Sequence, residues 1–343
     1  MLTPNVVPDF TGLRVAVVGD LVADNYLYAR PTRLSREAPV MVLRYVGEEI
    51  GAGGAANVAR NLAALEARVL LLGGVGRDAN GRELLRIVAK DGIDVAGVST
   101  VPEWVTPTKT RILGAEPGRM MHQVLRVDRE PEAPLARKVR AALADSVCSL
   151  AGRIDALLVS DYGYGLADGE LARAARAVRE SGAIVVLDPR RELDAFHGLS
   201  AFTPNLGELA LATNRPLERL VDLADIAAAA SELRARARPE QLLVTLGNRG
   251  MALFSDDHPE GVTVRASGSD SVVDVSGAGD SAAAVFTLAL AAGLPAPSAM
   301  RLANAAAGVV VMEHGTATCS LAALRSALPD SPQPARCSPA LRG

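Results

Sequence analysis

The run Asp274–Asp280, which reads DVSGAGD, combines residue types and spacing suited to phosphate chemistry. The alanine, leucine and phenylalanine residues after Asp280 predict a helix that ends near Gly293. The N-terminus of this helix would offer free N–H groups and the positive end of a helix dipole to an anion, through Gly277, Ala278 and Gly279. A carboxylate beside a bound phosphate makes chemical sense if it accepts the proton of a hydroxyl that attacks the phosphorus. The run therefore predicts phosphoryl transfer with Asp280 as the general base, and a simple helix cap is the alternative.

The overall composition excludes several other kinds of function. The 36 basic and 39 acidic residues give a net charge of −3, which offers no electrostatic attraction for nucleic acid or an anionic membrane. The apolar stretches at 282–294 and 302–312 are too short to span a bilayer, and the N-terminus lacks a signal-peptide pattern. The 3 cysteines lie far apart, and the 4 histidines show no metal-ligand spacing. We therefore expect a soluble cytoplasmic protein without a nucleic-acid or membrane partner.

The elements that would position Asp280 alternate between short apolar runs and alanine-rich helical patterns. Apolar runs such as Leu13–Gly19 and Ala156–Ser160, separated by helices, predict a mostly parallel sheet covered on both faces, which is the α/β class. Two segments without helical period, about 25–46 and 106–127, predict a small β lid added to an edge of that sheet, with long loops as the alternative. One domain is expected over residues 1–328, followed by a proline-rich, disordered tail at 329–343.

Two sequence signatures give the chain a family resemblance. The run DVSGAGD resembles the C-terminal signature of the ribokinase-like (PfkB) carbohydrate kinases. The stretch Gly53–Leu65, with the spacing Gly76-x-Asp78-x-x-Gly81, is similar to their N-terminal signature about 220 residues earlier. The resemblance covers residues 12 to about 328. It implies a ribokinase-like three-layer αβα core with a β lid, a sugar substrate, and ATP with Mg²⁺ as cofactors.

The same resemblance assigns residues to the nucleotide and its cations. Asn205 and Glu208 would hold magnesium and the phosphates through water, although Asn205 would also serve as a helix cap. The turn with Thr245, Gly247 and Gly250 would lie along ATP, and a hairpin turn explains these residues equally well. Asn304 would lie near the adenine of ATP. Asp274 and Ser276 would border a site for a monovalent cation such as K⁺.

The sugar side is assigned to the N-terminal half. Asp24 and Asn57 match the family's ligands for sugar hydroxyls, Gly53 would allow close approach of the backbone, and Asp161 and Asp20 follow apolar runs. Turn formation explains each aspartate when it is considered alone. The basic pair Lys109 and Arg111 would suit a substrate that already carries a phosphate, with solvated surface charge as the alternative.

Within the family, the segment Gly19–Val40 resembles the D-glycero-β-D-manno-heptose 7-phosphate kinases. This resemblance implies phosphorylation of the anomeric hydroxyl to give the 1,7-bisphosphate, for the synthesis of ADP-heptose and the lipopolysaccharide core. Two positions depart from those enzymes, because Tyr164 and Arg190 stand where they usually have lysine. We also expect the lid to pair two subunits in a homodimer.

Three alternatives to a heptose kinase stay open at this point. The chain could phosphorylate another sugar or a nucleoside, or it could be a catalytically silent, ligand-binding member of the family. The run Gly74–Ala79 also matches G-x-G-x-x-A, which would indicate an NAD-dependent dehydrogenase. However, this run does not follow the first predicted strand, which disfavours the dehydrogenase.

Overall fold

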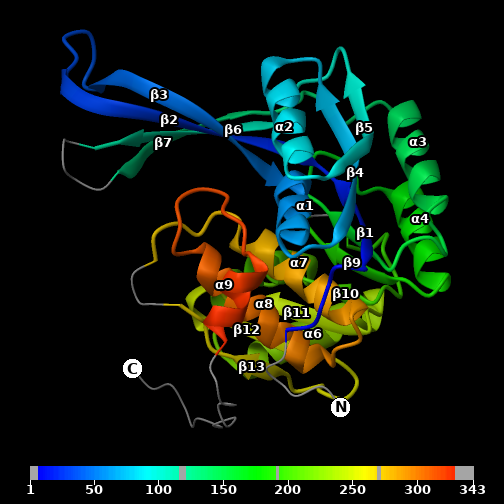
Figure 1. The fold of residues 1–343 in the computed structure, drawn as a ribbon. Helices are drawn as coiled ribbons and strands as arrows, with labels where there is room; N and C mark the ends of the chain where they lie inside the picture. The colour runs from blue at the N-terminus through cyan, green and yellow to red at the C-terminus, as the bar shows by residue number, and fades with distance from the viewer. Residues whose placement is uncertain (1–6, 116–120, 191–192, 269–271, 329–343) are drawn as a thin grey trace.

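The computed structural model describes residues 7–115, 121–190, 193–268 and 272–328. Their core is a nine-stranded sheet with the order β13-β12-β11-β10-β9-β8-β1-β4-β5 (Figure 1). The strands from β5 to β11 run parallel, whereas β12 and β13 are antiparallel to their neighbours. The strand bounds are β1 Arg14–Gly19, β4 Arg68–Gly76, β5 Asp94–Val101, β8 Ala156–Ser160, β9 Ile184–Asp188, β10 Ala201–Phe202, β11 Gln241–Thr245, β12 Met251–Phe254 and β13 Val262–Val264.

Helices cover both faces of this sheet, because neighbouring residues of the central strands point to opposite faces and both sets are apolar. Val15 and Val17 of β1 pack into one core, and Ala16 and Val18 pack into the other. The first core holds α1 Ala55–Ala64, α2 Ala79–Lys90, α7 Ala278–Ala291, α8 Ala296–Val310 and α9 Leu321–Ala327. The second core holds α3 Arg137–Cys148, α4 Gly169–Glu180, α5 Leu206–Ala212 and α6 Leu223–Ala237. Two short 3₁₀ helices, η1 Leu217–Arg219 and η2 Gly247–Arg249, lie in the loops. The predicted α/β class with helices on both faces is confirmed.

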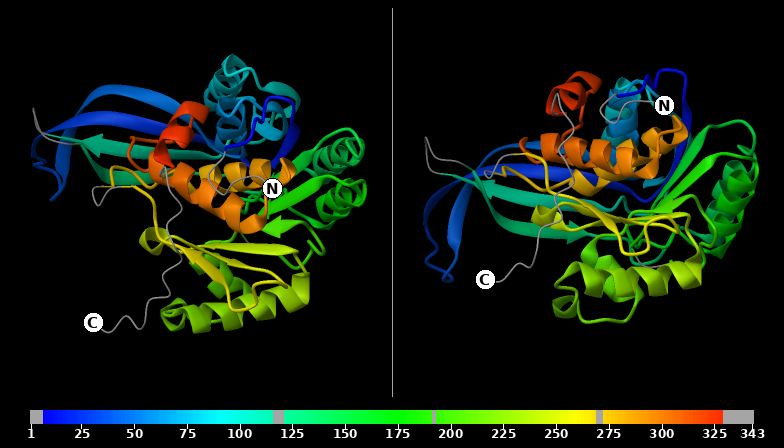
Figure 2. Two further views of the ribbon diagram at one scale, coloured as in Figure 1. Left: turned by 60° about the horizontal axis from the view of Figure 1, so that its bottom comes forward. Right: turned by 90° about the horizontal axis from the view of Figure 1, so that it is seen from below.

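A second sheet of four strands forms the lid, and it projects from the body in every view (Figures 1 and 2). Its order is β3-β2-β6-β7, with bounds β2 Leu21–Leu34, β3 Met41–Gly54, β6 Thr108–Gly114 and β7 His122–Arg129. The outer pairs are antiparallel, whereas β2 and β6 pair in parallel. Because β2 begins two residues after β1 ends, and β3 runs directly into α1, the lid is continuous with the core.

The lid differs in two ways from the sequence-based expectation. It is a separate sheet and not an addition to an edge of the central sheet, because β2 and β6 pair with each other and with their own hairpin partners. Its strands also extend beyond the expected segments 25–46 and 106–127, since β2 starts at Leu21, β3 reaches Gly54 and β7 reaches Arg129. Within the part of the chain that the structure describes, no helix is long and apolar enough to cross a membrane. The predicted tail at 329–343 lies outside the described residues, and the domain boundary at 328 stays a prediction.

Candidate active site

The carboxylate of Asp280 lies at the start of α7, where both of its oxygens accept hydrogen bonds. The Nδ2 of Asn57 donates to Oδ2 at 2.7 Å, and the hydroxyl of Tyr162 donates to Oδ1 at 2.7 Å. The side chain is buried, and this burial raises the pKa of Asp280 to about 6 even though both hydrogen bonds favour the charged form. A carboxylate that titrates near this pH can accept a proton under physiological conditions.

Backbone N–H groups gather beside this carboxylate. Gly277 caps α7 in the left-handed conformation, with φ 77°, and a Cβ at this position would lie 2.7 Å from Nδ2 of Asn57. The N–H groups of Gly279 and Asp280 belong to the first turn, so they have no acceptor within the helix. A Cβ at Gly279 would meet no described heavy atom within 4 Å, which leaves room for an anion in front of the turn. The structure therefore brings Gly277 and Gly279 of the predicted anion hole beside the predicted base, whereas the N–H of Ala278 donates to the carbonyl oxygen of Val275 at 3.4 Å.

Three of the predicted sugar-side residues meet where the lid joins the core. Asp24 is 4% exposed and forms an ion pair with Arg111, which lies on the neighbouring strand β6 opposite Tyr26, two residues beyond Asp24 in the register. A side chain at Gly53 would place its Cβ 2.4 Å from Oδ2 of Asp24, so only glycine fits there. Burial raises the pKa of Asp24, and the charge of Arg111 opposes this shift. Arg111 is therefore engaged with Asp24, which was not expected from the sequence.

The other member of the predicted basic pair, Lys109, faces Tyr162 and Asp280. Its Nζ lies 5.2 Å from the centre of the Tyr162 ring, within the range of a cation–π contact. Partial burial lowers the pKa of Lys109, and the carboxylate of Asp24 opposes that shift. An ammonium group is therefore positioned between the lid and Asp280, whose own pKa it lowers.

Asp20 and Asp161 follow β1 and β8, as predicted, but both carboxylates bind backbone N–H groups. Oδ2 of Asp20 accepts from Tyr162 and Tyr164, at 2.9 and 3.1 Å. Asp161 accepts from Gly163 at 2.8 Å and from Arg190 at 2.9 Å. Both residues thus stabilise the loop that carries Tyr162, which agrees with turn formation, the alternative role given to each aspartate in the sequence analysis. Their service as sugar ligands stays a prediction.

The predicted nucleotide residues lie at the carboxyl ends of β10 and β11. Asn205 caps α5 and forms a reciprocal capping box with Glu208, with N–H···O distances of 2.9 and 2.8 Å. An isolated bridge pairs Asn205 with Thr245, so the two segments are adjacent. The turn between β11 and β12 needs its glycines, because φ is 61° at Gly247 and 95° at Gly250. Asn304 is held on α8 by a 2.8 Å hydrogen bond from its Nδ2 to the carbonyl oxygen of Arg265.

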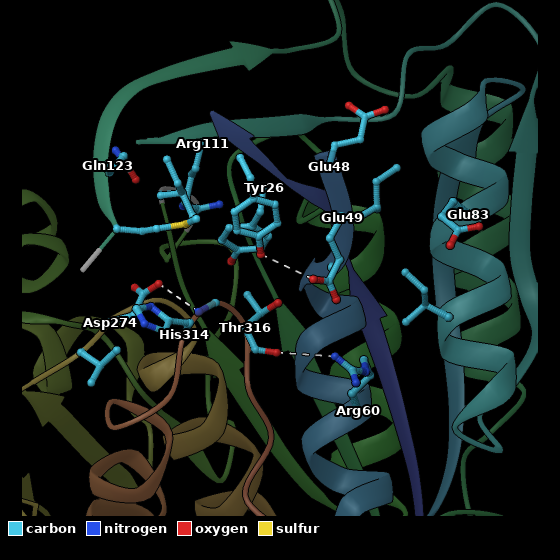
Figure 3. Close-up of a pocket in the computed structure, with 18 of the residues that line it drawn as sticks. Tyr26, Glu48, Glu49, Arg60, Glu83, Arg111, Gln123, Asp274, His314 and Thr316 are labelled. Carbon is cyan, nitrogen blue, oxygen red and sulfur yellow. Dashed lines mark hydrogen bonds between the residues drawn. The ribbon is translucent and has the colours of Figure 1, made fainter. Parts of the chain in front are cut away.

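A cavity of about 870 Å³ opens between the lid, α1, α2 and the loops at 273–274 and 314–316, and Arg111 and Asp274 are the predicted site residues that line it. In Figure 3, Asp274, His314 and Thr316 lie on one side of this cavity, with Tyr26 and Arg111 of the lid near them. The Oδ1 of Asp274 accepts from the N–H of Ser276 at 2.9 Å, and its Oδ2 accepts from the N–H of Gly315 at 3.0 Å. The two predicted cation-site residues are therefore joined by a hydrogen bond at the cavity wall.

Sequence reasoning missed Tyr162 as a functional residue. It belongs to the run Asp161–Gly165, in which Asp161 is assigned a role from the sequence and Tyr164 is noted as a departure. The contact of Tyr162 with Asp280 joins positions 118 residues apart, so no local pattern reveals it. The one signal in the sequence is its position directly after a predicted parallel strand, where site residues gather.

Comparison with known proteins agrees with this geometry. Residues 13–323 match the pfkB family of carbohydrate kinases. The chain is 38% identical over 310 residues to the bifunctional protein HldE of Geobacter metallireducens, covering 90% of this chain and 61% of that protein. It is 40% identical over 321 residues to HldE of Magnetococcus marinus, covering 92% and 63%. The chain thus spans less than two thirds of the length of these relatives.

Solved structures show the same fold at low sequence identity. Arabidopsis thaliana ribokinase complexed with ribose and ATP superposes with a TM-score of 0.70 at 21% identity, covering 93% of this chain and 100% of that one. Escherichia coli phosphofructokinase-2 in complex with potassium gives a TM-score of 0.72 at 21% identity, covering 92% and 98%. Together with the family match, these neighbours indicate a sugar kinase and argue against the dehydrogenase. The chain belongs to the pfkB family of carbohydrate kinases.

Proposed function

We propose that this enzyme transfers the γ-phosphoryl group of ATP to the anomeric hydroxyl of D-glycero-β-D-manno-heptose 7-phosphate. The observation that carries the transfer step is the buried carboxylate of Asp280 beside open N–H groups at the start of α7. The heptose substrate is supported by the resemblance of Gly19–Val40 to the heptose kinases and by relatives named HldE. The 1,7-bisphosphate would serve the synthesis of ADP-heptose for the lipopolysaccharide core, and we place the reaction in the cytoplasm.

In this reaction, Asp280 accepts the proton of the anomeric hydroxyl while that oxygen attacks the γ-phosphorus and ADP leaves. The N–H groups of the turn at Gly277, Ala278 and Gly279 stabilise the charge on the transferring group. Asp24, Gly53 and Asn57 hold the sugar hydroxyls, with Asp20 and Asp161 as further candidates. Thr245, Gly247, Gly250 and Asn304 line the nucleotide.

The experiment that tests this function is a phosphorylation screen with ATP, magnesium and a panel of sugars, nucleosides and sugar 7-phosphates. We expect the heptose 7-phosphate to be the best acceptor, with Lys109 contacting its phosphate. Lys109→Ala should therefore reduce the preference for phosphorylated over unphosphorylated heptose and leave the KM for ATP unchanged. Turnover of another sugar or a nucleoside would reassign the substrate, and no turnover with any acceptor would indicate a silent binding protein.

Magnesium, when bound, would neutralise the charge of the ATP phosphates. The described residues contain no cluster of three or more His, Cys, Asp or Glu side chains that would hold a metal directly. Both oxygens of Glu208 are already engaged, one by the N–H of Asn205 and the other by Arg190 at 3.2 Å. This arrangement fits a magnesium ion held by phosphates and water, with Glu208 and Asn205 acting through water.

Glu208→Gln should raise the magnesium concentration needed for half-maximal activity about 10-fold, as expected for a residue that acts through a metal's water shell. Glutamine can maintain the capping box, so α5 should remain intact while the negative charge is lost. Parallel magnesium titrations of the two proteins measure the effect, with the KM for sugar as the control. Superimposed magnesium curves would contradict the assignment.

We also propose that Asp274 and Ser276 border a site for K⁺, since Asp274 lines the cavity and its Oδ1 accepts a hydrogen bond from the N–H of Ser276. The similar phosphofructokinase-2 of Escherichia coli was solved in complex with potassium, which supports this proposal. Activity that is the same in potassium and in a large organic cation would contradict it.

We further propose that the lid pairs two copies of the chain. Apolar side chains are exposed on the lid strands and on the turn between β2 and β3: Leu34, Val40, Met41, Tyr45, Val46, Val124, Leu125 and Val127. A two-fold partner that presents the same strands would cover them, along with the free edges of β3 and β7.

Light scattering should therefore report about 71 kDa, twice the 35.6 kDa of one chain. Leu125→Asp should lower this mass towards that of a monomer, because it places a charge in the interface. Leu211→Asp changes a residue that is 67% exposed on α5, away from the lid, and should leave the mass unchanged. A fully active wild-type monomer would refute the paired lid without affecting the assignment of Asp280.

A further inference from the structure

Tyr162 contributes one of the two hydrogen bonds that hold the carboxylate of Asp280. Asn57, which fixes Oδ2, belongs to the N-terminal signature, whereas Tyr162, which fixes Oδ1, belongs to neither signature. Burial raises the pKa of Tyr162 well above its ordinary value, and the nearby charge of Asp280 raises it further. The phenol therefore stays protonated, so in this contact it serves as a donor.

Contacts on several sides fix the Tyr162 side chain. Its backbone N–H donates to Oδ2 of Asp20 at 2.9 Å, at the end of β1. A Cβ at Gly54 would lie 3.5 Å from Cδ2 of its ring, so the ring lies beside the glycine that begins α1. The ammonium of Lys109 lies 5.2 Å from the ring centre. The hydroxyl is thus aimed at Asp280 by the core sheet, α1 and the lid.

We propose that Tyr162 is a positioning residue for the general base: its hydroxyl orients Oδ1 of Asp280 and stabilises the ionised carboxylate in a buried site. This inference rests on the proposed function, in which Asp280 accepts the proton of the sugar hydroxyl. That proton passes from the sugar oxygen to a carboxylate oxygen, and Tyr162 keeps its own proton throughout. Each carboxylate oxygen can accept more than one hydrogen bond, so the sugar hydroxyl need not displace the phenol.

Other charged groups around Asp280 also influence the pH profile that a variant without the Tyr162 hydroxyl would show. Asp24 on β2 raises the pKa of Asp280, and Lys109 on β6 lowers it. Asp188, at the end of β9, also faces Asp280, and its own pKa is raised mainly by burial. Asp20 titrates in the same region, because burial raises its pKa to about 7. A change in the pH profile must therefore be traced to Asp280 specifically.

Tyr162→Phe tests the proposal, because it removes the hydroxyl and keeps the ring beside Gly54 and Lys109. A hydrogen bond to a charged group is worth about one unit of pKa or more. The acid limb of the kcat profile, expected near pH 6 in the wild type, should therefore move up by about one unit. At pH 6, kcat should fall about 5-fold, with a much smaller loss at pH 8.5 and little change in the KM for sugar.

Tyr164→Phe is the matched control. It removes a phenol hydroxyl from the same loop, and Asp20 binds the backbone N–H of both tyrosines. The Tyr164 hydroxyl, however, donates to Glu130 at 3.2 Å and not to Asp280. The acid limb of the kcat profile of Tyr164→Phe should therefore coincide with that of the wild type. If Tyr164→Phe moves the limb equally, the effect belongs to the loop and Asp20, and the proposal is overturned.

The pH dependence of unfolding gives a second readout that does not involve turnover. Without the phenol, the folded-state pKa of Asp280 lies further above its unfolded value, so ionisation costs the folded state more. The stability difference between Tyr162→Phe and wild type should then grow as the pH rises from 4 to 8. In an Asp280→Asn background this growth should disappear. Growth that persists there would come from another group such as Asp20 and would overturn the proposal.

The possible outcomes distinguish the base from its positioning residue. If Asp280→Asn retains near-full turnover, the proposed base is wrong. If Asp280→Asn loses turnover but Tyr162→Phe keeps the wild-type acid limb, only the positioning role is wrong. Should Tyr162→Phe fail to fold, 3-fluorotyrosine can replace the 5 tyrosines. A more acidic phenol is a stronger donor, so the acid limb should move to lower pH, and an unmoved limb overturns the proposal.

Discussion

Replacing Asp280 by asparagine should lower kcat by ~100- to 10,000-fold, which is the usual contribution of a positioned general base. Asparagine has nearly the same shape, but its amide cannot accept a proton from the attacking sugar hydroxyl. The N–H groups of the turn before it are unchanged, so the affinity for ATP should be close to that of the wild type. Steady-state kinetics with the sugar acceptor, and nucleotide binding measured separately, check both expectations.

Unfolding measurements exclude misfolding as the cause of this loss. The pKa of Asp280 is raised from 3.8 to about 6 by burial, so wild-type stability falls as the pH rises between these values. Asparagine does not titrate, and Asp280→Asn should therefore gain stability relative to wild type between pH 4 and pH 7. Tyr162 can keep a hydrogen bond by accepting from the new amide. A variant that is folded and retains most of its turnover would remove Asp280 from the role of base.

Replacing Arg111 by alanine should destabilise the chain by about 3–5 kcal/mol at pH 8, because it leaves the carboxylate of Asp24 buried without its partner. The side chains of this pair are only 13% and 6% exposed. Burial already raises the pKa of Asp24, and removal of Arg111 would raise it further. The penalty should therefore become smaller as the pH falls, because protonation of Asp24 removes the unpaired charge, and it should grow as the pH rises.

Urea unfolding at several pH values measures this effect. Arg126→Ala is the matched control, since Arg126 pairs with Asp128 on β7 and its side chain is 50% exposed. An exposed pair of this kind is worth about 1 kcal/mol or less. Asp24→Asn combined with Arg111→Ala should recover most of the lost stability. An equal loss at pH 4 and pH 8 would point to lost packing and not to an unpaired carboxylate.

The central sheet and the position of Asp280 at a helix start could be predicted from sequence because their signals are local. Apolar runs such as Ala156–Ser160 mark buried parallel strands, and glycines directly before an alanine-rich helix mark an anion site. Strand β5 is not predicted, because Asp94–Val101 mixes glycine, serine and threonine with its valines and lies at an edge of the sheet. Edge strands are partly exposed and therefore lack a continuous apolar run.

Features that depend on pairing between distant segments could not be predicted. The parallel register of β2 and β6 places Asp24 beside Lys109, and nothing in either segment specifies this alignment. It also brings Arg111 onto Asp24, so a residue expected to bind a substrate phosphate proves to be paired within the lid. Tyr162 was missed for the same reason, since its role depends on a contact between two loops.

The direct connection between core and lid has a mechanical consequence. Strand β2 has 14 residues and so spans about 46 Å, which means that a rotation of about 5° at its base shifts its tip by about 4 Å. Any such rotation would pass through the junction of Asp20 and Gly54, where the N–H of Ala55 donates a 3.0 Å hydrogen bond to the carbonyl oxygen of Asp20. Gly54 tolerates no replacement there, because a Cβ would lie 2.4 Å from that oxygen. Evolution and engineering can thus change the tip of the lid to suit new acceptors. Changes at Asp20 or Gly54, in contrast, would also disturb the loop that holds Asp280.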